Sequence, residues 1–135
     1  MIRLAALFTC LAGVAVAEPI SGYDFLTPET QALQDDDFAN PGMLWVDIGT
    51  DLWESGDPSC ASCHGAAEAM RDVGNHYPQW SEEMGRVISL EQRINACRVD
   101  HQGQEALGDG SRELLGLTAM VMNQSRGLPI SVAVD

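Results

Sequence analysis

A five-residue motif, Cys60-Ala61-Ser62-Cys63-His64, constrains the fold of this chain more than any other feature of its sequence. The CxxCH pattern is typical of the covalent attachment of c-type haem. In a helical turn the two cysteines lie on one face, so both thiols reach the vinyl groups of a single porphyrin. His64 follows one residue later, rotated so that its imidazole can meet the iron. The motif therefore predicts one covalent haem c, attached through Cys60 and Cys63, with His64 as the proximal iron ligand.

Two other chemistries use closely spaced cysteines, and both are weaker interpretations here. A redox-active CxxC disulfide begins a helix that follows a strand, and no strand signal precedes Cys60. A zinc site needs a fourth ligand, usually from a second pair of cysteines or histidines, and the sequence offers no such pair.

The composition indicates one acidic domain. The chain has 135 residues, with 7 arginines, no lysine and 20 Asp and Glu, for a formal net charge of −13. A content of 45% hydrophobic and 20% charged residues excludes a disordered or fibrous protein. Phosphate binding needs clustered Lys and Arg, so the charge argues against nucleic acid and against anionic membrane surfaces as partners.

The first residues have the pattern of a secretory signal peptide, residues 1–17. Arg3 supplies the positive charge, Leu4 to Val16 the apolar run, and Ala15-Val16-Ala17 the small-x-small cleavage site. The alternative is a buried N-terminal helix. No later segment has the roughly 20 apolar residues that cross a bilayer. We therefore expect residues 18–135 to form an exported domain without stable membrane insertion.

Helix signals predict an all-α, c-type cytochrome-like domain of about four to five helices around the haem. Besides the motif, the expected helices run from Thr27 to about Phe38, from Met43 to Glu54, from Ser89, and from Ser111 to about Gln124. The third begins with capping-box spacing. We find no convincing strand, and we expect residues 74–86 to be rich in loops.

One glycine predicts how these helices pack. Gly49-Thr50-Asp51-Leu52-Trp53 has the pattern of the first helix of small c-type cytochromes. In that fold a glycine, with an aromatic residue beside it, lets this helix cross closely over the last one. The last helix here is the one over residues 111–124.

The residues alone leave the second axial ligand of the iron open. Most small c-type cytochromes use a methionine well downstream, which favours Met120 or Met122, although methionine at helical spacing is more often a core residue. Further candidates are Met70, Met84, His76 and His101, of which the two histidines fit surface positions better.

Cys97 competes with the methionines for a different reason. It shares a helix face with Leu90 and Ile94, and it is a lone thiol in a compartment where free thiols are avoided. Its thiolate could ligate iron, and Arg93 and Arg98 could lower its pKa, although only Arg93 shares its face. The alternatives are a buried inert thiol and an intermolecular disulfide.

Longer stretches of the chain resemble the N-terminal haem domain of the SoxA family, the larger cytochrome subunit of the SoxAX complex in bacterial thiosulfate oxidation. The most specific stretch runs from Gln34 to Asp47. The others are Ser21-Gly22-Tyr23, Cys60 to Gly65, Leu90 to Asn95 with Cys97-Arg98, and Gln124 to Ile130. Together they span nearly all of residues 18–135.

The resemblance implies a function, a set of partners and a ligand. SoxA pairs in the periplasm with a small monohaem cytochrome, SoxX, and the two conjugate thiosulfate to a cysteine of the SoxYZ carrier protein, an L-cysteine S-thiosulfotransferase activity. The N-terminal haem of the family is attached through the motif matching Cys60, Cys63 and His64. Its distal ligand is the cysteine of an Arg-Ile-Asn-x-Cys-Arg segment, which falls on Cys97.

The chain also departs from the family pattern. SoxA has two cytochrome-like domains, of which the second holds the catalytic haem, and this chain contains no second CxxCH. We therefore expect no catalytic residue in it, and a role in electron transfer or structural support. The alternatives are a stand-alone periplasmic monohaem electron-transfer cytochrome, or a haem sensor with an open sixth position.

Overall fold

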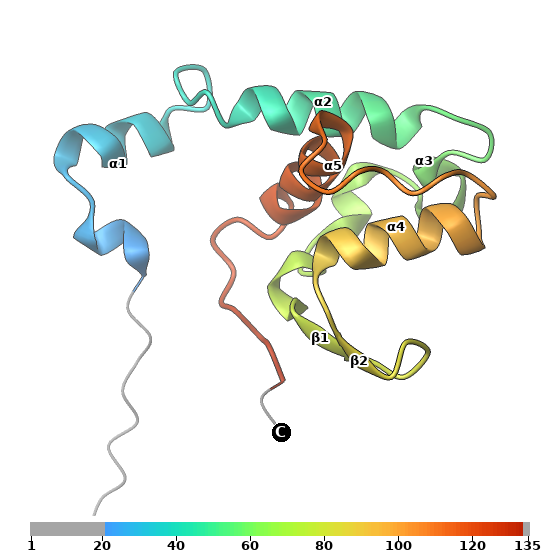
Figure 1. Ribbon diagram of the computed structural model, residues 1–135. Coiled ribbons are helices and arrows are strands. Elements are labelled where there is room, and N and C mark those ends of the chain that lie inside the picture. The colour runs from blue at the N-terminus through green and yellow to red at the C-terminus, as the bar shows by residue number, and fades with distance from the viewer. Residues whose placement is uncertain (1–20, 134–135) are drawn as a thin grey trace, which may run out of the picture.

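A computed structural model describes residues 21–133 of the chain, and they form a predominantly helical domain (Figure 1). The fold class predicted from the sequence is confirmed. The signal peptide predicted for residues 1–17 lies outside the described residues. In the described part, no helix has the length and apolar character needed to span a membrane. The elements are, in chain order, η1 (Gly22–Phe25), α1 (Pro28–Asp35), α2 (Met43–Glu54), α3 (Cys60–His64), η2 (Ala67–Met70), η3 (Gly74–His76), β1 (Gln79–Ser81), β2 (Arg86–Ile88), α4 (Leu90–Asp100) and α5 (Arg112–Asn123).

The centre of the domain is the crossing of α2 over α5 (Figure 1). The two helices meet at Gly49 and Gly116, where a Cβ built on Gly49 would lie 2.1 Å from the Gly116 carbonyl oxygen. Real side chains do not approach a backbone so closely, so the crossing requires glycine. The close contact predicted from Gly49 is therefore confirmed. Beside it lies the buried core of Trp53, Leu90, Leu117, Met120 and Val121.

A side-chain cap begins helix α4 at the position that the sequence predicts. The Ser89 side chain accepts from the Gln92 backbone N–H at 3.4 Å, and the Gln92 Oε1 accepts from the Ser89 N–H at 3.0 Å. These two bonds form the reciprocal capping box at the start of α4. Since α4 forms one wall of the cavity described below, this cap also fixes that wall.

Replacing Ser89 by alanine is expected to lower the free energy of unfolding by about 1 kcal/mol, because the N-terminal amides of α4 lose a capping acceptor. Denaturant unfolding of the purified protein measures the change. Ser131→Ala is the matched control, since Ser131 is exposed and its hydrogen bonds, to Asn75 and His76, come from its backbone and not from its hydroxyl. Equal stability of the two variants would contradict a stabilising cap.

Helix α1 is shorter than predicted. It ends at Asp35 rather than near Phe38, because the Asp36 carboxylate accepts from the backbone N–H of Phe38 and of Ala39 at 2.9 and 3.2 Å. Such local bonds give the backbone an alternative to the helix. Helix α1 lies to one side of the body (Figure 1), and Arg126, just after α5, pairs with Asp37 and bonds to the Gln34 carbonyl.

A β-hairpin replaces part of the stretch predicted to be loops, so the expectation of no strand was wrong. Strands β1 and β2 pair antiparallel, with Trp80 opposite Val87, and Gly85 in the connecting turn has a φ of 62°. Strands of three residues are too short to give a recognisable alternation in the sequence. The side chain of Ile88, only 1% exposed, anchors the hairpin to the body.

Candidate haem site

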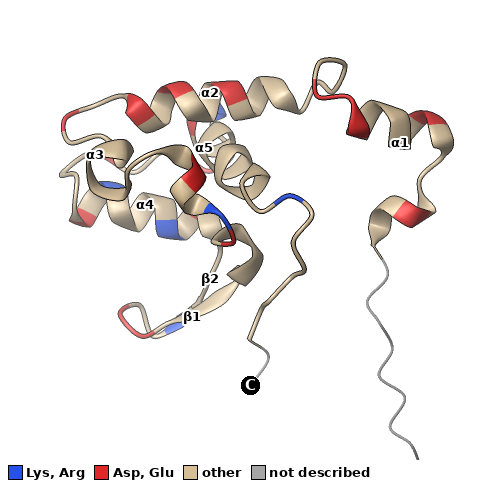
Figure 2. Cartoon of the chain, turned by 180° about the vertical axis from the view of Figure 1, so that it is seen from behind, with Lys and Arg blue, Asp and Glu red and all other residues tan. Residues whose placement is uncertain are grey.

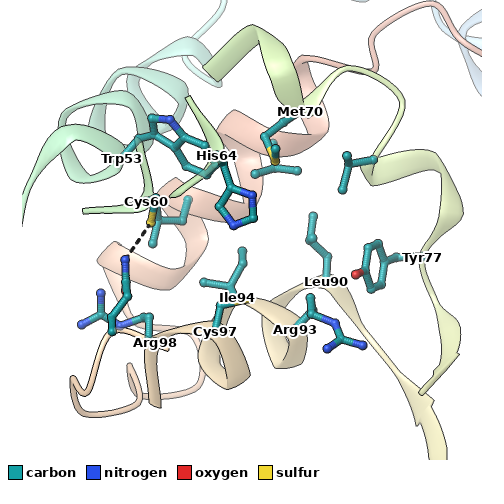
Figure 3. A pocket seen from close by; sticks show the side chains of 14 residues that line it. Trp53, Cys60, His64, Met70, Tyr77, Leu90, Arg93, Ile94, Cys97 and Arg98 are labelled. Carbon is teal, nitrogen blue, oxygen red and sulfur yellow. Dashed lines mark hydrogen bonds between the residues drawn. The ribbon is translucent and has the colours of Figure 1, made fainter. Parts of the chain in front are cut away.

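A largely apolar cavity of about 290 Å³ opens between two walls of the domain. One wall comes from α3 and the segment after it, and the other comes from α4 (Figure 3). The volume lies at the lower end of the range of ligand and cofactor pockets. Apolar side chains dominate the lining, namely Met70, Val73, Leu90, Ile94, Leu117 and Val121.

Helix α3 consists of the CxxCH motif itself. The Ser59 side chain accepts from the Ser62 N–H at 3.1 Å and starts the helix, and Gly65, with a φ of 77°, ends it. The half-buried Cys60 lines the cavity, and its sulfur accepts a hydrogen bond from Gln102 Nε2 at 3.6 Å. Cys63, three residues later, is exposed. One helical turn therefore carries both thiols, one of them in the cavity lining, with the spacing that two thioether bonds to one porphyrin need.

His64 extends from α3 into the cavity, and Trp53 holds the end of that helix in place (Figure 3). The two rings lie 5.7 Å apart between centroids, at an interplanar angle of 34°. The indole Nε1 of Trp53 donates to the carbonyl oxygen of Gly65 at 2.9 Å. Since Trp53 is almost fully buried, it ties the position of His64 to the core.

Replacing Trp53 by phenylalanine is expected to destabilise the protein by roughly 1–3 kcal/mol, because the hydrogen bond to the Gly65 carbonyl and part of the packing of the buried indole are both lost. Guanidinium unfolding followed by absorption at the haem site measures this. Trp45→Phe is the matched control, since Trp45 lies on the same helix but is 39% exposed. Similar losses in both variants would contradict the role given to the Trp53 hydrogen bond.

Cys97 lies on α4, on the opposite wall of the cavity from His64 (Figure 3). Leu90 and Ile94 line the cavity with it, as their shared helix face predicts. Burial raises the pKa of the Cys97 thiol above its usual range, and the positive charge of Arg93 offsets this only in part. The sequence predicted that the neighbouring arginines lower the pKa of Cys97, and in this structure the pKa is raised instead.

The other candidate ligands lie elsewhere, with one exception. Met120 is fully buried in the core and Met122 packs against Gly74, and neither lines the cavity. The His76 Nδ1 bonds to the Ser131 carbonyl oxygen at 3.0 Å, outside the cavity. His101 caps the end of α4, and Met84 lies in the turn of the hairpin. The exception, Met70, lines the cavity but lies beside His64 rather than across from it (Figure 3).

Two polar residues at the end of the cavity away from Cys60 were not predicted to belong to the site. Tyr77 comes from the segment interpreted as loop, where no periodicity identifies an inward-facing side chain. Arg93 was noted only as a neighbour of Cys97, four residues earlier on the same helix face. Its spacing from Leu90 and Cys97 is the one signal that could have placed it on this wall.

These residues fit a haem. The cavity joins an apolar lining to Cys60 and His64 on one wall and Cys97 on the other, and the exposed Cys63 lies one helical turn after Cys60. Imidazole and thiolate are both axial ligands of haem iron in proteins. A lining of this composition suits a flat, largely apolar macrocycle.

Comparisons with known proteins identify the family. Residues 48–130 match the SoxA/TsdA cytochrome c domain. The chain is 40% identical over 120 residues to the L-cysteine S-thiosulfotransferase subunit SoxA of Pseudaminobacter salicylatoxidans. It is 38% identical over 120 residues to the subunit of the same name from Rhodovulum sulfidophilum. Each alignment covers 85% of this chain and 42% of the relative. The crystal structure of SoxXA from P. pantotrophus superposes with a TM-score of 0.76 at 35% identity, covering 85% of this chain and 45% of that one.

The chain therefore belongs to the SoxA/TsdA cytochrome c domain family, as the resemblance in its sequence predicts. It spans less than half the length of the relatives it matches. As a domain of this family it takes a covalently bound haem c, and it contains one CxxCH motif to attach it.

Proposed function

We propose that this chain is the N-terminal haem domain of a SoxA-type subunit of L-cysteine S-thiosulfotransferase. In this proposal Cys60 and Cys63 carry the haem, His64 is its proximal ligand and Cys97 its distal ligand. The observation that carries it is the placement of His64 and Cys97 on opposite walls of one cavity, beside Cys60. The SoxA relatives support the assignment to a thiosulfotransferase subunit.

The domain acts in electron transfer or structural support rather than in bond-making. When bound, the haem supplies a centre for one-electron chemistry. The protein part holds the two axial side chains, keeps water from the macrocycle and fixes α3 through Trp53. No residue of this chain is assigned a catalytic role in thiosulfate conjugation, which in the SoxA family belongs to a second haem.

The proposal includes the domain organisation, the location and the partners. Residues 1–17 are the signal peptide and residues 18–135 the haem domain, exported to the periplasm. The neighbouring SoxXA structure supports a SoxX-type monohaem cytochrome as the partner. A SoxYZ-type carrier protein is the acceptor whose cysteine receives the thiosulfate.

The protein purified from its native periplasm, with any subunit bound to it, tests this function. The denatured intact mass gives the signal cleavage site and the number of covalent haems. A thiosulfate-dependent mass increase on a SoxYZ-type carrier gives the activity. We expect cleavage after Ala17, haem on this domain, a SoxX-type cytochrome in the preparation, and conjugation. A free-standing monohaem protein without conjugating activity would instead support the electron-transfer cytochrome.

A further inference from the structure

The charge balance of the haem cavity lining is opposite to that of the chain as a whole. The chain has 20 acidic residues and 7 arginines, and Figure 2 shows the acidic residues spread over α1, α2 and the loops. Among the described residues that line the cavity, however, there are two arginines, Arg93 and Arg98, and no Asp or Glu. A partly buried cation needs an anionic partner. The lining therefore carries a positive charge, which favours a ligand with negative charge.

The two arginines lie at different ends of the cavity. Arg98 lies toward the end occupied by Cys60, and its Nε donates to the Glu105 carbonyl oxygen at 3.3 Å (Figure 3). Arg93 lies at the opposite end, below Tyr77, whose hydroxyl is turned into the cavity (Figure 3). Of the described side chains that line the cavity, Arg93 and Tyr77 therefore bring the hydrogen-bond donors at the end remote from the thioether positions.

The chemistry of the porphyrin decides which of its groups reaches that end. The vinyl carbons that form thioethers lie on one half of the ring, and the propionate carboxylates lie on the other half. Thioethers to Cys60 and Cys63 at one end direct the propionates toward the other. We propose that Arg93 and Tyr77 form a carboxylate-binding subsite that holds a haem propionate. This inference rests on the proposed covalent attachment at Cys60 and Cys63.

The existing contacts of Arg93 leave donors free for such a ligand. Its Nη2 donates to Ser81 Oγ at 3.5 Å, and its Nη1 lies 3.8 Å from the carboxylate of Glu83, which is 65% exposed. Both contacts are long, and a guanidinium has five N–H donors. The hydroxyl of Tyr77 has no hydrogen-bond partner among the described residues. A propionate provides an acceptor for the Tyr77 hydroxyl and for the remaining donors of Arg93.

The geometry also gives Arg93 a second candidate role, which the experiment must separate from the first. Arg93 lies four residues before Cys97 on one helix face, so its charge also acts on the sulfur. An arginine that serves the propionate changes the vibrations of the carboxylate when it is removed. One that serves the thiolate changes the electronic signature of the iron instead. The two readouts are independent.

Resonance Raman spectra of the mature holoprotein test the subsite, because the propionate bending mode shifts with hydrogen bonding to the carboxylate. The variants are Arg93→Gln, Arg93→Lys and Tyr77→Phe, with Arg98→Gln as the matched control from the same helix and cavity. We expect the bending mode to shift to lower frequency in R93Q and Y77F, to return at least partly in R93K, and to stay unchanged in R98Q. The paramagnetic resonance of the ferric iron should keep its wild-type g-values in R93Q.

Several results would overturn the inference. An unchanged propionate bending mode in both R93Q and Y77F would contradict the subsite. A shift in R98Q as large as that in R93Q would contradict it too. Altered g-values with an unchanged bending mode assign Arg93 to Cys97 instead. Intact mass separates failure of the subsite from failure of the proposed function. Wild-type protein without covalent haem would reject both the proposed function and the subsite. Wild-type protein with covalent haem, whose propionate mode does not shift in R93Q and Y77F, would reject the subsite alone. If R93Q does not fold, Y77F decides.

Discussion

Replacing Cys97 by alanine is expected to leave the haem attached but to convert most of its ferric iron from low spin to high spin. The proposed thioethers are formed by Cys60 and Cys63, which the change does not touch. Among the described residues that α4 contributes to this wall, no other strong ligand accompanies Cys97, since the rest are Leu90, Ile94 and the two arginines. Loss of the sulfur therefore opens the sixth position, and the ferrous protein should bind carbon monoxide readily.

Absorption and paramagnetic resonance of the purified variant measure this change. Met122→Leu is the matched control, because Met122 is the alternative ligand that lies outside the cavity, packed against Gly74. We expect wild-type spectra from Met122→Leu. Low-spin iron in Cys97→Ala, with spectra altered in Met122→Leu, would show that the sulfur ligand comes from the last helix and not from α4.

The largest loss of stability is expected from replacing Gly49 by leucine. Its Cβ alone would lie 2.1 Å from the Gly116 carbonyl oxygen and 2.6 Å from the Met120 Cβ. Helices α2 and α5 would have to separate along the crossing that forms the core. Overpacking of this kind costs about 3 kcal/mol or more, a large part of the stability of a small domain. Thermal unfolding should show a much lower midpoint, or no folded protein.

Gly108→Ala is the control for this change. A Cβ on Gly108 would meet nothing within 4 Å, and its φ lies outside the left-handed region, so the substitution should be neutral or slightly stabilising. Gly49→Ala should already be strongly destabilising, since the clash is with backbone. If Gly49→Ala unfolded at the wild-type midpoint, the close crossing of the two helices would be wrong.

Local signals account for most of the fold. Helix α2 has the bounds that its periodicity predicts, from Met43 to Glu54, and α4 starts after Ser89 because the capping box forms. Gly49 predicted a contact between segments about 70 residues apart, because a close helix crossing excludes a Cβ. These features depend on residues that lie near one another in the sequence or on a single steric requirement.

Features that depend on tertiary context were less predictable. The hairpin of Gln79–Ser81 and Arg86–Ile88 has strands too short to show a period, and it is stabilised by packing of Ile88. The end of α1 depends on one hydrogen-bonding choice by Asp36. In both cases the interaction that decides the structure cannot be inferred from the helix or strand propensities of the residues.

The residues of the candidate haem site also fall into those that local spacing predicts and those that depend on tertiary packing. Cys60, Cys63 and His64 are identified by their spacing, because one helical turn brings them together. The approach of Cys97 to the same cavity depends on how α4 packs against α5, which no local pattern specifies. The resemblance to SoxA pointed to Cys97 before the fold did. The place of Tyr77 in the cavity lining could be seen only in the structure, since Tyr77 lies in a segment without hydrophobic periodicity.

Axial ligation by His64 and Cys97 is the central claim, and the near-infrared spectrum of the ferric wild-type protein tests it most directly. Magnetic circular dichroism together with paramagnetic resonance identifies the pair of axial ligands of low-spin ferric haem. We expect the pattern of histidine with thiolate, without the methionine-to-iron charge-transfer band. A methionine-to-iron band, or a high-spin ferric iron in the wild-type protein, would contradict the account.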